Sequence, residues 1–294
     1  MNNRTKIRSL NIEWAKMWET GILDAWSHLY IQKYGSITEA WDHKAPEYVK
    51  TMEHSNRTQL LEKLEQHRPE TVLDVGAGAG IFAIPLAKTK SVKRVVAVEP
   101  STGMLDILKG KAEADKLTNI DCINKKWEDT TEEELIEMNK GKYDLIISSH
   151  ALYYITDLHN SFKKMNDVCR GYVYLLIGAA ANTKDSVYEK YYERIYRKPK
   201  PPYPDYACLY MILRELDIHP NIEMLDAYTE KYVNSVEEIV ESWKDNVDGE
   251  LTEGQRSAIR AYLTESGMIK EEDGGLYWVW RSKDALIHWK VEEQ

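Results

Sequence analysis

The chain has 294 residues, of which 43% are hydrophobic and 30% are charged, as in an ordinary globular protein. Its formal net charge of −9 disfavours extended contact with the phosphates of a nucleic acid, so no nucleic acid partner is expected. No apolar run approaches the roughly 18 residues of a membrane-spanning helix, and no apolar stretch follows the first residues. We therefore expect no membrane partner, and the three scattered cysteines favour a reducing, cytoplasmic location.

The first 68 residues are predicted to form a helical cap. Between residues 5 and 34, tryptophan and tyrosine side chains recur at helical spacing, which favours helices packed onto the body of the protein. Alternatively, some of these side chains line a pocket, and His28 and Tyr34 are then the polar candidates for a catalytic role. Residues 55–67 continue the cap with an amphipathic helix.

A short buried strand followed by a glycine-rich turn is predicted over residues 71–80. Glycine stands at alternate positions after the strand, at Gly76, Gly78 and Gly80. Glycines at this spacing let the backbone adopt positive φ angles and let a ligand reach main-chain N–H groups without meeting a Cβ atom. Residues 81–88 have the apolar content of a packed helix. The unit is therefore a strand, a ligand loop and a helix.

Two acids accompany this loop. Asp74 lies inside the strand, where its carboxylate would repel the phosphates of a dinucleotide but attract an ammonium group. A dinucleotide fingerprint would also require glycine where Ile81 stands, which disfavours a nicotinamide oxidoreductase. Glu99 ends a second apolar strand at 95–98 and can accept the two hydroxyls of a ribose. Together these features predict a ligand with a ribose, a positive charge and no phosphate, faced by both carboxylates.

These motifs resemble those of the class I S-adenosylmethionine-dependent methyltransferases. Residues 72–80 correspond to the family's first motif and residues 96–100 to its acidic second motif, within a resemblance that covers roughly residues 40–178. The resemblance implies S-adenosylmethionine as cofactor and S-adenosylhomocysteine as product. The loop would hold the amino-acid end of the cofactor and Glu99 its ribose. The cofactor-binding residues implied by the two motifs are Asp74, Gly76, Ala77, Gly78, Gly80, Glu99 and Pro100.

Further cofactor contacts are implied on either side of this core. Trp41 and Tyr48 resemble the segment that folds over the cofactor, and their ring faces could cover the sulfonium, although helix packing explains them equally well. Trp127 and Glu128 follow a short strand at 120–124, at the turn where the family reads the adenine. The usual Asp-Ala pair is absent there, and Trp127 could equally belong to the core.

The fourth strand, at 145–149, ends where an open α/β sheet normally carries out its chemistry. Ser149 is expected to contact the cofactor. His150 could act as a general base, because an imidazole accepts a proton near neutral pH, or could only donate a hydrogen bond. Tyr153 and Tyr154 have the same ambiguity. No His/Cys cluster has the spacing of metal ligands, so no metal is predicted.

The predicted fold class is α/β, a Rossmann-like, seven-stranded and mostly parallel sheet flanked by helices. After the cap at 1–68, residues 69–178 form the cofactor-binding core. Residues 179–270 form a helical insertion over the acceptor site, with helices at 184–197, 205–216, 235–247 and 252–266. Tyrosines at 188, 191, 192, 196, 206 and 210 either line that lid or pack it. Residues 271–294 form a hairpin that completes the sheet, with its turn at 281–284.

The predicted function is transfer of a methyl group from S-adenosylmethionine to a small-molecule acceptor. A protein or tRNA acceptor is disfavoured by the net charge but is a remaining alternative. The second alternative is a regulatory protein that binds the cofactor without catalysis. It would keep the glycine loop and lack an acceptor cavity.

Overall fold

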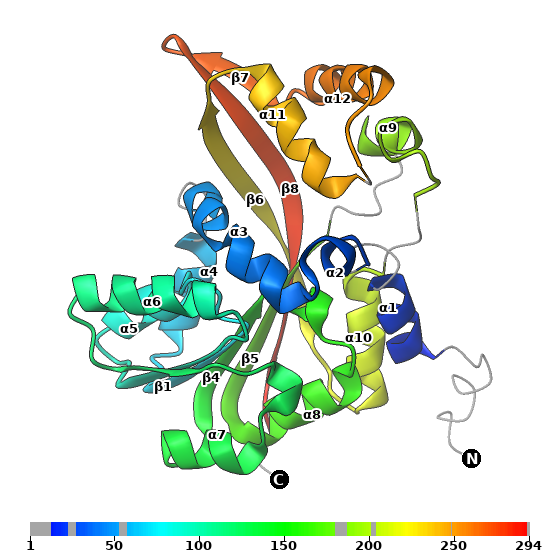
Figure 1. The fold of residues 1–294 in the computed structure, drawn as a ribbon. Coiled ribbons are helices and arrows are strands. Elements are labelled where there is room, and N and C mark those ends of the chain that lie inside the picture. The colour runs from blue at the N-terminus through cyan, green and yellow to red at the C-terminus, as the bar shows by residue number, and fades with distance from the viewer. Residues whose placement is uncertain are drawn as a thin grey trace.

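The computed structural model describes residues 13–22, 28–52, 58–179, 187–200, 204–247 and 249–292. At its centre lies an open sheet with the strand order β3-β2-β1-β4-β5-β8-β6, while β7 pairs with β8 outside that path (Figure 1). No helix in the described ranges has both the length and the apolar content needed to cross a bilayer.

Five strands form the parallel part of the sheet: β1 (Thr71–Val75), β2 (Arg94–Val98), β3 (Ile120–Ile123), β4 (Tyr143–Ser149) and β5 (Cys169–Gly178). The central strands are continuous apolar runs because helices cover both of their faces. This arrangement confirms the predicted α/β class.

Helices form a layer on each face of the sheet (Figure 1). One layer contains α4 (Thr58–Gln66), α5 (Ala83–Lys88) and α6 (Thr102–Ala114), and α3 (Ile37–Met52) packs on α6. The other layer contains α7 (Glu132–Asn139), α8 (Leu158–Val168) and α10 (Tyr206–Glu215). The cap helix α1 (Trp14–Ile22) packs on α10, and α2 (His28–Tyr34) packs on α3.

Strand β8 (Gly275–Lys290) is one continuous strand, so the predicted hairpin with a turn at 281–284 is wrong. The second half of β8 pairs antiparallel with β5. Strand β6 (Asn221–Val233) pairs antiparallel with β8 from Leu276 to His288. Strand β6 lies within residues 179–270, which were predicted as a helical insertion, so that prediction is wrong for this segment. We call this pair the β6–β8 ribbon; it extends beyond the rest of the sheet (Figure 1).

The turn that does occur lies between β7 (Ile269–Glu272) and β8. Its two central residues, Asp273 and Gly274, have φ angles of 50° and 75°. Two consecutive positive φ angles are the requirement of a two-residue hairpin turn, and Asp-Gly is a favoured pair for it. The hairpin is therefore displaced towards the N-terminus from the predicted position.

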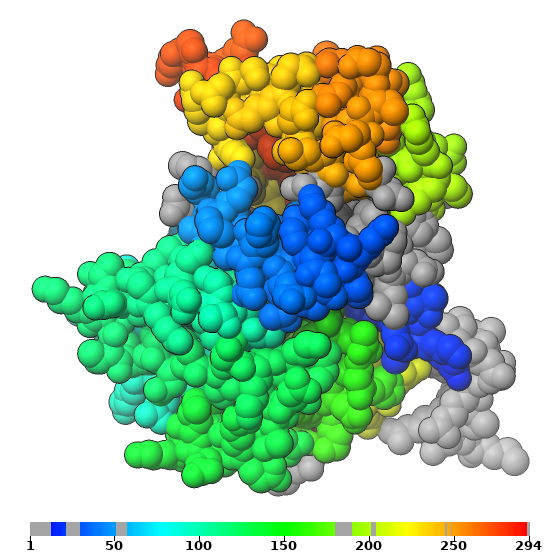
Figure 2. All heavy atoms as spheres, viewed as in Figure 1, coloured from blue at the N-terminus to red at the C-terminus, as the bar shows by residue number. Residues whose placement is uncertain are grey.

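Three helices, α9 (Val187–Tyr196), α11 (Val236–Ser242) and α12 (Glu253–Glu265), pack on the outer half of the ribbon. They share a hydrophobic cluster with Val233 of β6 and Leu276 of β8, separate from the clusters on the two sheet faces. In the space-filling view α3 covers the middle of this face and the α11–α12 pair lies above it (Figure 2). Residues 184–186, which begin the predicted helix at 184–197, lie outside the described ranges.

Candidate cofactor and acceptor site

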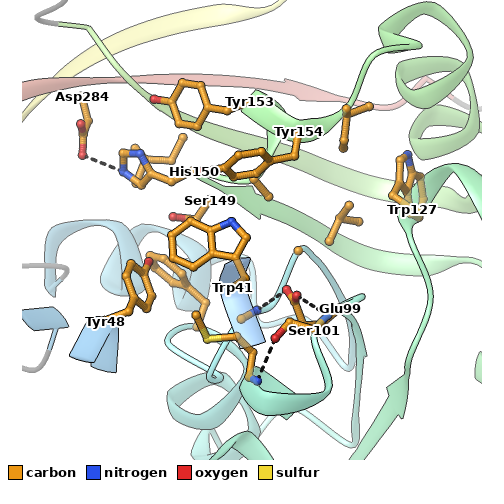
Figure 3. Close-up of a pocket in the computed structure, with 18 of the residues that line it drawn as sticks. Trp41, Tyr48, Glu99, Ser101, Trp127, Ser149, His150, Tyr153, Tyr154 and Asp284 are labelled. Carbon is orange, nitrogen blue, oxygen red and sulfur yellow. Dashed lines mark hydrogen bonds and ion pairs between the residues drawn. The ribbon is translucent and has the colours of Figure 1, made fainter. Parts of the chain in front are cut away.

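A cavity of about 870 Å³ lies at the carboxyl ends of β1, β2, β4 and β5. This volume falls within the roughly 300–1,000 Å³ typical of small-molecule sites. The glycine loop, α3, the segment after β4 and the β6–β8 ribbon supply its walls. Figure 3 shows Glu99 and Ser101 at one end and His150, Tyr153 and Asp284 at the other. We call these the cofactor end and the acceptor end.

The glycine loop has the backbone conformation that its sequence requires. Gly76, Gly78 and Gly80 have φ angles of 73°, 53° and 80°. A Cβ atom on Gly76 would lie 2.2 Å from the Cβ of Ala151, whereas one on Gly78 would meet no atom within 4 Å. Gly76 therefore allows close packing against the segment after β4, and Gly78 leaves open space on the cavity side of the loop.

Glu99 is buried at the cofactor end, and both of its carboxylate oxygens are held by backbone donors. The Gly78 N–H donates to Oε2 and the Ser101 N–H donates to Oε1, each at 2.9 Å. Burial raises the pKa of Glu99, and these two hydrogen bonds oppose that shift. Because a carboxylate has about four lone-pair sites, two remain for the hydroxyls of a ribose. The residues present therefore fit the nucleoside of S-adenosylmethionine.

Asp74 lies beneath the loop and does not line the cavity, so of the two acids only Glu99 is among the described lining residues. Its carboxyl group accepts a hydrogen bond from the Ala83 N–H, while its Oδ2 atom is buried without a partner. Burial, with a smaller contribution from nearby Glu99, raises the pKa of Asp74 from 3.8 to about 7. A positive charge on a ligand above the loop would offset this cost.

Replacement of Asp74 by Asn should stabilise the ligand-free protein above neutral pH. Since folding raises the pKa of Asp74, its contribution to stability is present below pH 3.8 and is lost as the pH rises through about 7. Three units of pKa correspond to roughly 4 kcal/mol, so we expect a gain on the order of 3 kcal/mol at pH 8 that shrinks towards pH 4. Urea unfolding at several pH values measures it, and parallel pH profiles for the two proteins would contradict it.

Helix α3 supplies an aromatic wall at the cofactor end. Trp41 and Tyr48 both line the cavity, with ring centroids 5.2 Å apart in an edge-to-face arrangement. Asp42 anchors this helix to α6, because its Oδ1 atom accepts hydrogen bonds from the Ser101 hydroxyl and the Gly103 N–H. The anchor fixes the two rings above the residues that hold Glu99. Aromatic rings at the cavity wall suit a ligand that carries a cation.

Trp127 and Glu128 also line the cavity, at the turn after β3. Trp127 is buried, and its indole N–H has no hydrogen-bond partner within the described part of the chain. The ammonium group of Lys164 lies 4.3 Å from the centroid of the Trp127 ring and donates to the Trp127 carbonyl. The Trp127 side chain therefore packs in the core and also lines the cavity, as both predictions for it stated.

At the acceptor end, Ser149 is the last residue of β4 and His150 follows it directly. His150 has a φ angle of 53°, unusual for a residue with a side chain, and its N–H donates to the Leu176 carbonyl at 2.8 Å. Its Nε2 atom lies 3.3 Å from Oδ2 of Asp284 in β8, as the dashed line in Figure 3 shows. Burial raises the pKa values of Tyr153 and Tyr154, so both remain neutral phenols near pH 7. His150 is therefore the better candidate for a general base among these three.

The structure does not bring all the predicted residues to the cavity. Tyr34 packs against Tyr30 and His43 and is not among the described lining residues. His28 begins α2, and its side chain lies outside the described part of the structure. Ala77 and Gly80 support the loop from behind, and Pro100 lines the cavity beside Glu99.

The acceptor wall comes from the two strands of the β6–β8 ribbon, whereas the helical insertion at 179–270 was predicted to cover the acceptor site. Tyr191 and Tyr196 of α9 pack in the outer hydrophobic cluster and do not line the cavity. Described residues of the ribbon do line it, namely Leu225 to Thr229, Trp280, Ser282 and Asp284. Aromatic and β-branched residues near Tyr228 and Thr229 could have indicated β6. Asp284 was not predicted as a site residue because it lies in the polar stretch 281–284, which was predicted as a turn.

Comparison with known proteins decides the family. A family model described as a methyltransferase domain matches residues 41–203, more than half of the chain. The chain belongs to this methyltransferase family. The prediction of a class I S-adenosylmethionine-dependent methyltransferase is thereby confirmed, and S-adenosylmethionine is the cofactor.

Three individual proteins are similar to this methyltransferase. A Haemophilus influenzae protein named "Uncharacterized protein" is 25% identical over 258 residues, which are 86% of this chain and 89% of that protein. A Methanosphaera stadtmanae protein named "Probable ribosomal RNA small subunit methyltransferase A" is 32% identical over 90 residues, 31% of this chain and 30% of that protein. The solved structure of the YcgJ protein from Bacillus subtilis has a TM-score of 0.52 at 14% identity and covers 81% of this chain and 98% of its own. This structural likeness supports the fold.

Proposed function

We propose that this methyltransferase transfers a methyl group to a small molecule bound at the acceptor end of the cavity. One observation carries the proposal: a single cavity continues from the glycine loop and Glu99 to His150 and Asp284. A purely regulatory protein would need the cofactor end alone. An acceptor end enclosed by α3 and the ribbon suits a small molecule better than a folded macromolecule, and the net charge of −9 disfavours RNA. The free cysteines among the described residues support a cytoplasmic location.

The proposed roles follow from position. S-adenosylmethionine supplies an electrophilic methyl group on a positively charged sulfur. The open face of Gly78 and the carboxylate of Glu99 hold its nucleoside, while Trp41 and Tyr48 cover it and exclude water. His150 accepts a proton from the acceptor, and Asp284 orients the imidazole through Nε2. The part played by the protein is therefore mainly positioning plus one proton transfer.

Isothermal titration with S-adenosylmethionine and S-adenosylhomocysteine tests the cofactor end. We expect dissociation constants on the order of 10 μM, as for a site with several charged and aromatic contacts. Absence of heat for both compounds at millimolar concentration would reject the proposed function.

A radiolabel experiment tests the class of acceptor. The protein is incubated with S-adenosylmethionine tritiated in the methyl group and with a cell extract of its source organism, from which macromolecules are either removed or retained. We expect tritium in the low-mass fraction in both cases. Tritium confined to precipitated protein or RNA would replace the small-molecule acceptor with a macromolecular one.

A further inference from the structure

The lining of the cavity carries negative charge at its acceptor end, and the proposed function does not assign a role to this charge. Within the described ranges the whole cavity presents four carboxyl groups, Glu99, Glu128, Asp226 and Asp284, and a single lysine, Lys126. A phosphate or carboxylate on an acceptor would meet repulsion there, whereas a cation would be attracted.

The four carboxyl groups are not equivalent. Glu99 and Glu128 lie at the cofactor end, where the proposed function places the nucleoside. Asp226 is 82% exposed and pairs with the ammonium of Lys283, so its charge is neutralised at the surface. Asp284 remains as the charged group of the acceptor end. It is 14% exposed, and no lysine or arginine of the described chain pairs with it.

Asp284 has one oxygen available for a ligand. Its Oδ2 atom lies 3.3 Å from His150 Nε2, and its Oδ1 atom has no hydrogen-bond partner within the described residues. This oxygen can accept a hydrogen bond from an ammonium group of a ligand. The rings of Tyr153, Tyr154 and Trp280 also line this end, and ring faces attract an ammonium group.

We propose that the acceptor is an amine, bound as an ammonium ion by Asp284 and the surrounding rings, and that nitrogen is the atom methylated. This inference rests on the proposed function and specifies its substrate class.

The proton balance of the transfer closes with His150 and the bound ammonium. When Nε2–H of His150 donates to Asp284, Nδ1 carries the lone pair that accepts one proton from the bound ammonium. The freed nitrogen lone pair then forms the new N–C bond to the methyl carbon while the C–S bond breaks and its electrons remain on sulfur. The products are a methylated ammonium ion and S-adenosylhomocysteine, and the proton on His150 leaves to water.

Three probes with the same phenylethyl group and different charge test the subsite. The protein saturated with S-adenosylhomocysteine is titrated with 2-phenylethylamine, 2-phenylethanol and 3-phenylpropionate. We expect the amine to bind at least about ten-fold tighter than the alcohol and the carboxylate to bind most weakly. Equal affinities, preference for the alcohol or carboxylate, or no binding of the amine at about 20 mM would each overturn the proposal.

Two variants test whether Asp284 causes the preference for the amine. Asp284→Asn should weaken binding of the amine about ten-fold and leave the alcohol within about two-fold. Glu271→Gln removes an equal charge from exposed β7, away from the cavity lining, and should change neither. An unchanged amine affinity in Asp284→Asn would also overturn the proposal. The affinity for S-adenosylhomocysteine is measured first. If the protein does not bind S-adenosylhomocysteine, the proposed function is rejected. If it binds S-adenosylhomocysteine but shows no preference for the amine probe, only the amine proposal is rejected.

The radiolabel experiment supplies an independent arm. Passing the small-molecule extract over a cation-exchange resin at neutral pH should remove methyl acceptance, because the resin retains ammonium ions. Acceptance that survives the cation exchanger and disappears on an anion exchanger would overturn the proposal.

Discussion

Replacement of His150 by Asn should lower the rate of methyl transfer by about 10² to 10³-fold while the affinity for S-adenosylhomocysteine stays within about two-fold. The reason is that the variant keeps the cavity and loses the lone pair that accepts the proton. Asn is the appropriate replacement because His150 has a φ angle of 53°, and Asn adopts this left-handed conformation more readily than most residues. The initial rate with tritiated S-adenosylmethionine and the small-molecule extract is the measurement.

The matched control is His159→Asn. His159 lies on α8, where its Nε2 atom pairs with Glu215 at 2.8 Å on the surface, and it does not line the cavity. Its replacement should leave the rate unchanged. A loss below ten-fold in His150→Asn would mean that His150 only donates a hydrogen bond to the wall of the cavity, the alternative that its sequence position also allowed.

Replacement of Gly76 by Ala should reduce both stability and cofactor affinity. The new Cβ atom would lie 2.2 Å from the Cβ of Ala151, and a φ angle of 73° adds strain for any residue with a side chain. We expect the free energy of unfolding to fall by roughly 2–4 kcal/mol. Because relief of the clash must move the loop away from the segment after β4, S-adenosylhomocysteine affinity should fall about 100-fold. Urea unfolding and isothermal titration measure the two effects.

Gly274→Ala separates backbone strain from the clash. Gly274 has nearly the same φ angle, 75°, but a Cβ atom there would meet nothing within 4 Å. This control should lose about 1 kcal/mol of stability and no cofactor affinity. If Gly76→Ala loses no more stability and no more cofactor affinity than Gly274→Ala, the close approach of the loop to Ala151 does not contribute to cofactor binding.

The cofactor end was predictable from the sequence because its determinants are local. A strand, three alternate glycines and an acid at the end of the next strand lie within thirty residues, from Thr71 to Pro100. Their spacing fixes the backbone and places Glu99 beside Gly78, since parallel neighbouring strands end at the same edge. Asp74 shows the limit of the same reasoning. Its side chain is buried under the loop, where the backbone N–H of Ala83 donates a hydrogen bond to it, and the strand pattern does not reveal these surroundings.

The wall that the β6–β8 ribbon gives to the acceptor end could not be predicted, because long-range strand pairing creates it. Asp284 reaches His150 through the pairing of β8 with β5, and the two residues are 134 positions apart in the chain. The polar residues from Arg281 to Asp284 suggested a turn, but they are polar for two different reasons. Ser282 and Asp284 line the cavity, while Lys283 pairs with Asp226 at the surface.

This alternation along β8 has a consequence for how the enzyme could diversify. Trp280, Ser282 and Asp284 are the positions of β8 that line the cavity, whereas Arg281 stacks on Tyr228 and Lys283 pairs with Asp226. Substitutions confined to the even positions would alter which acceptor is chosen, and the odd positions would preserve the strand's outer contacts. Alternate residues of this one strand would therefore determine the choice of acceptor and the stability of the strand pairing. A library randomised at positions 280, 282 and 284 is a small starting point for changing the acceptor.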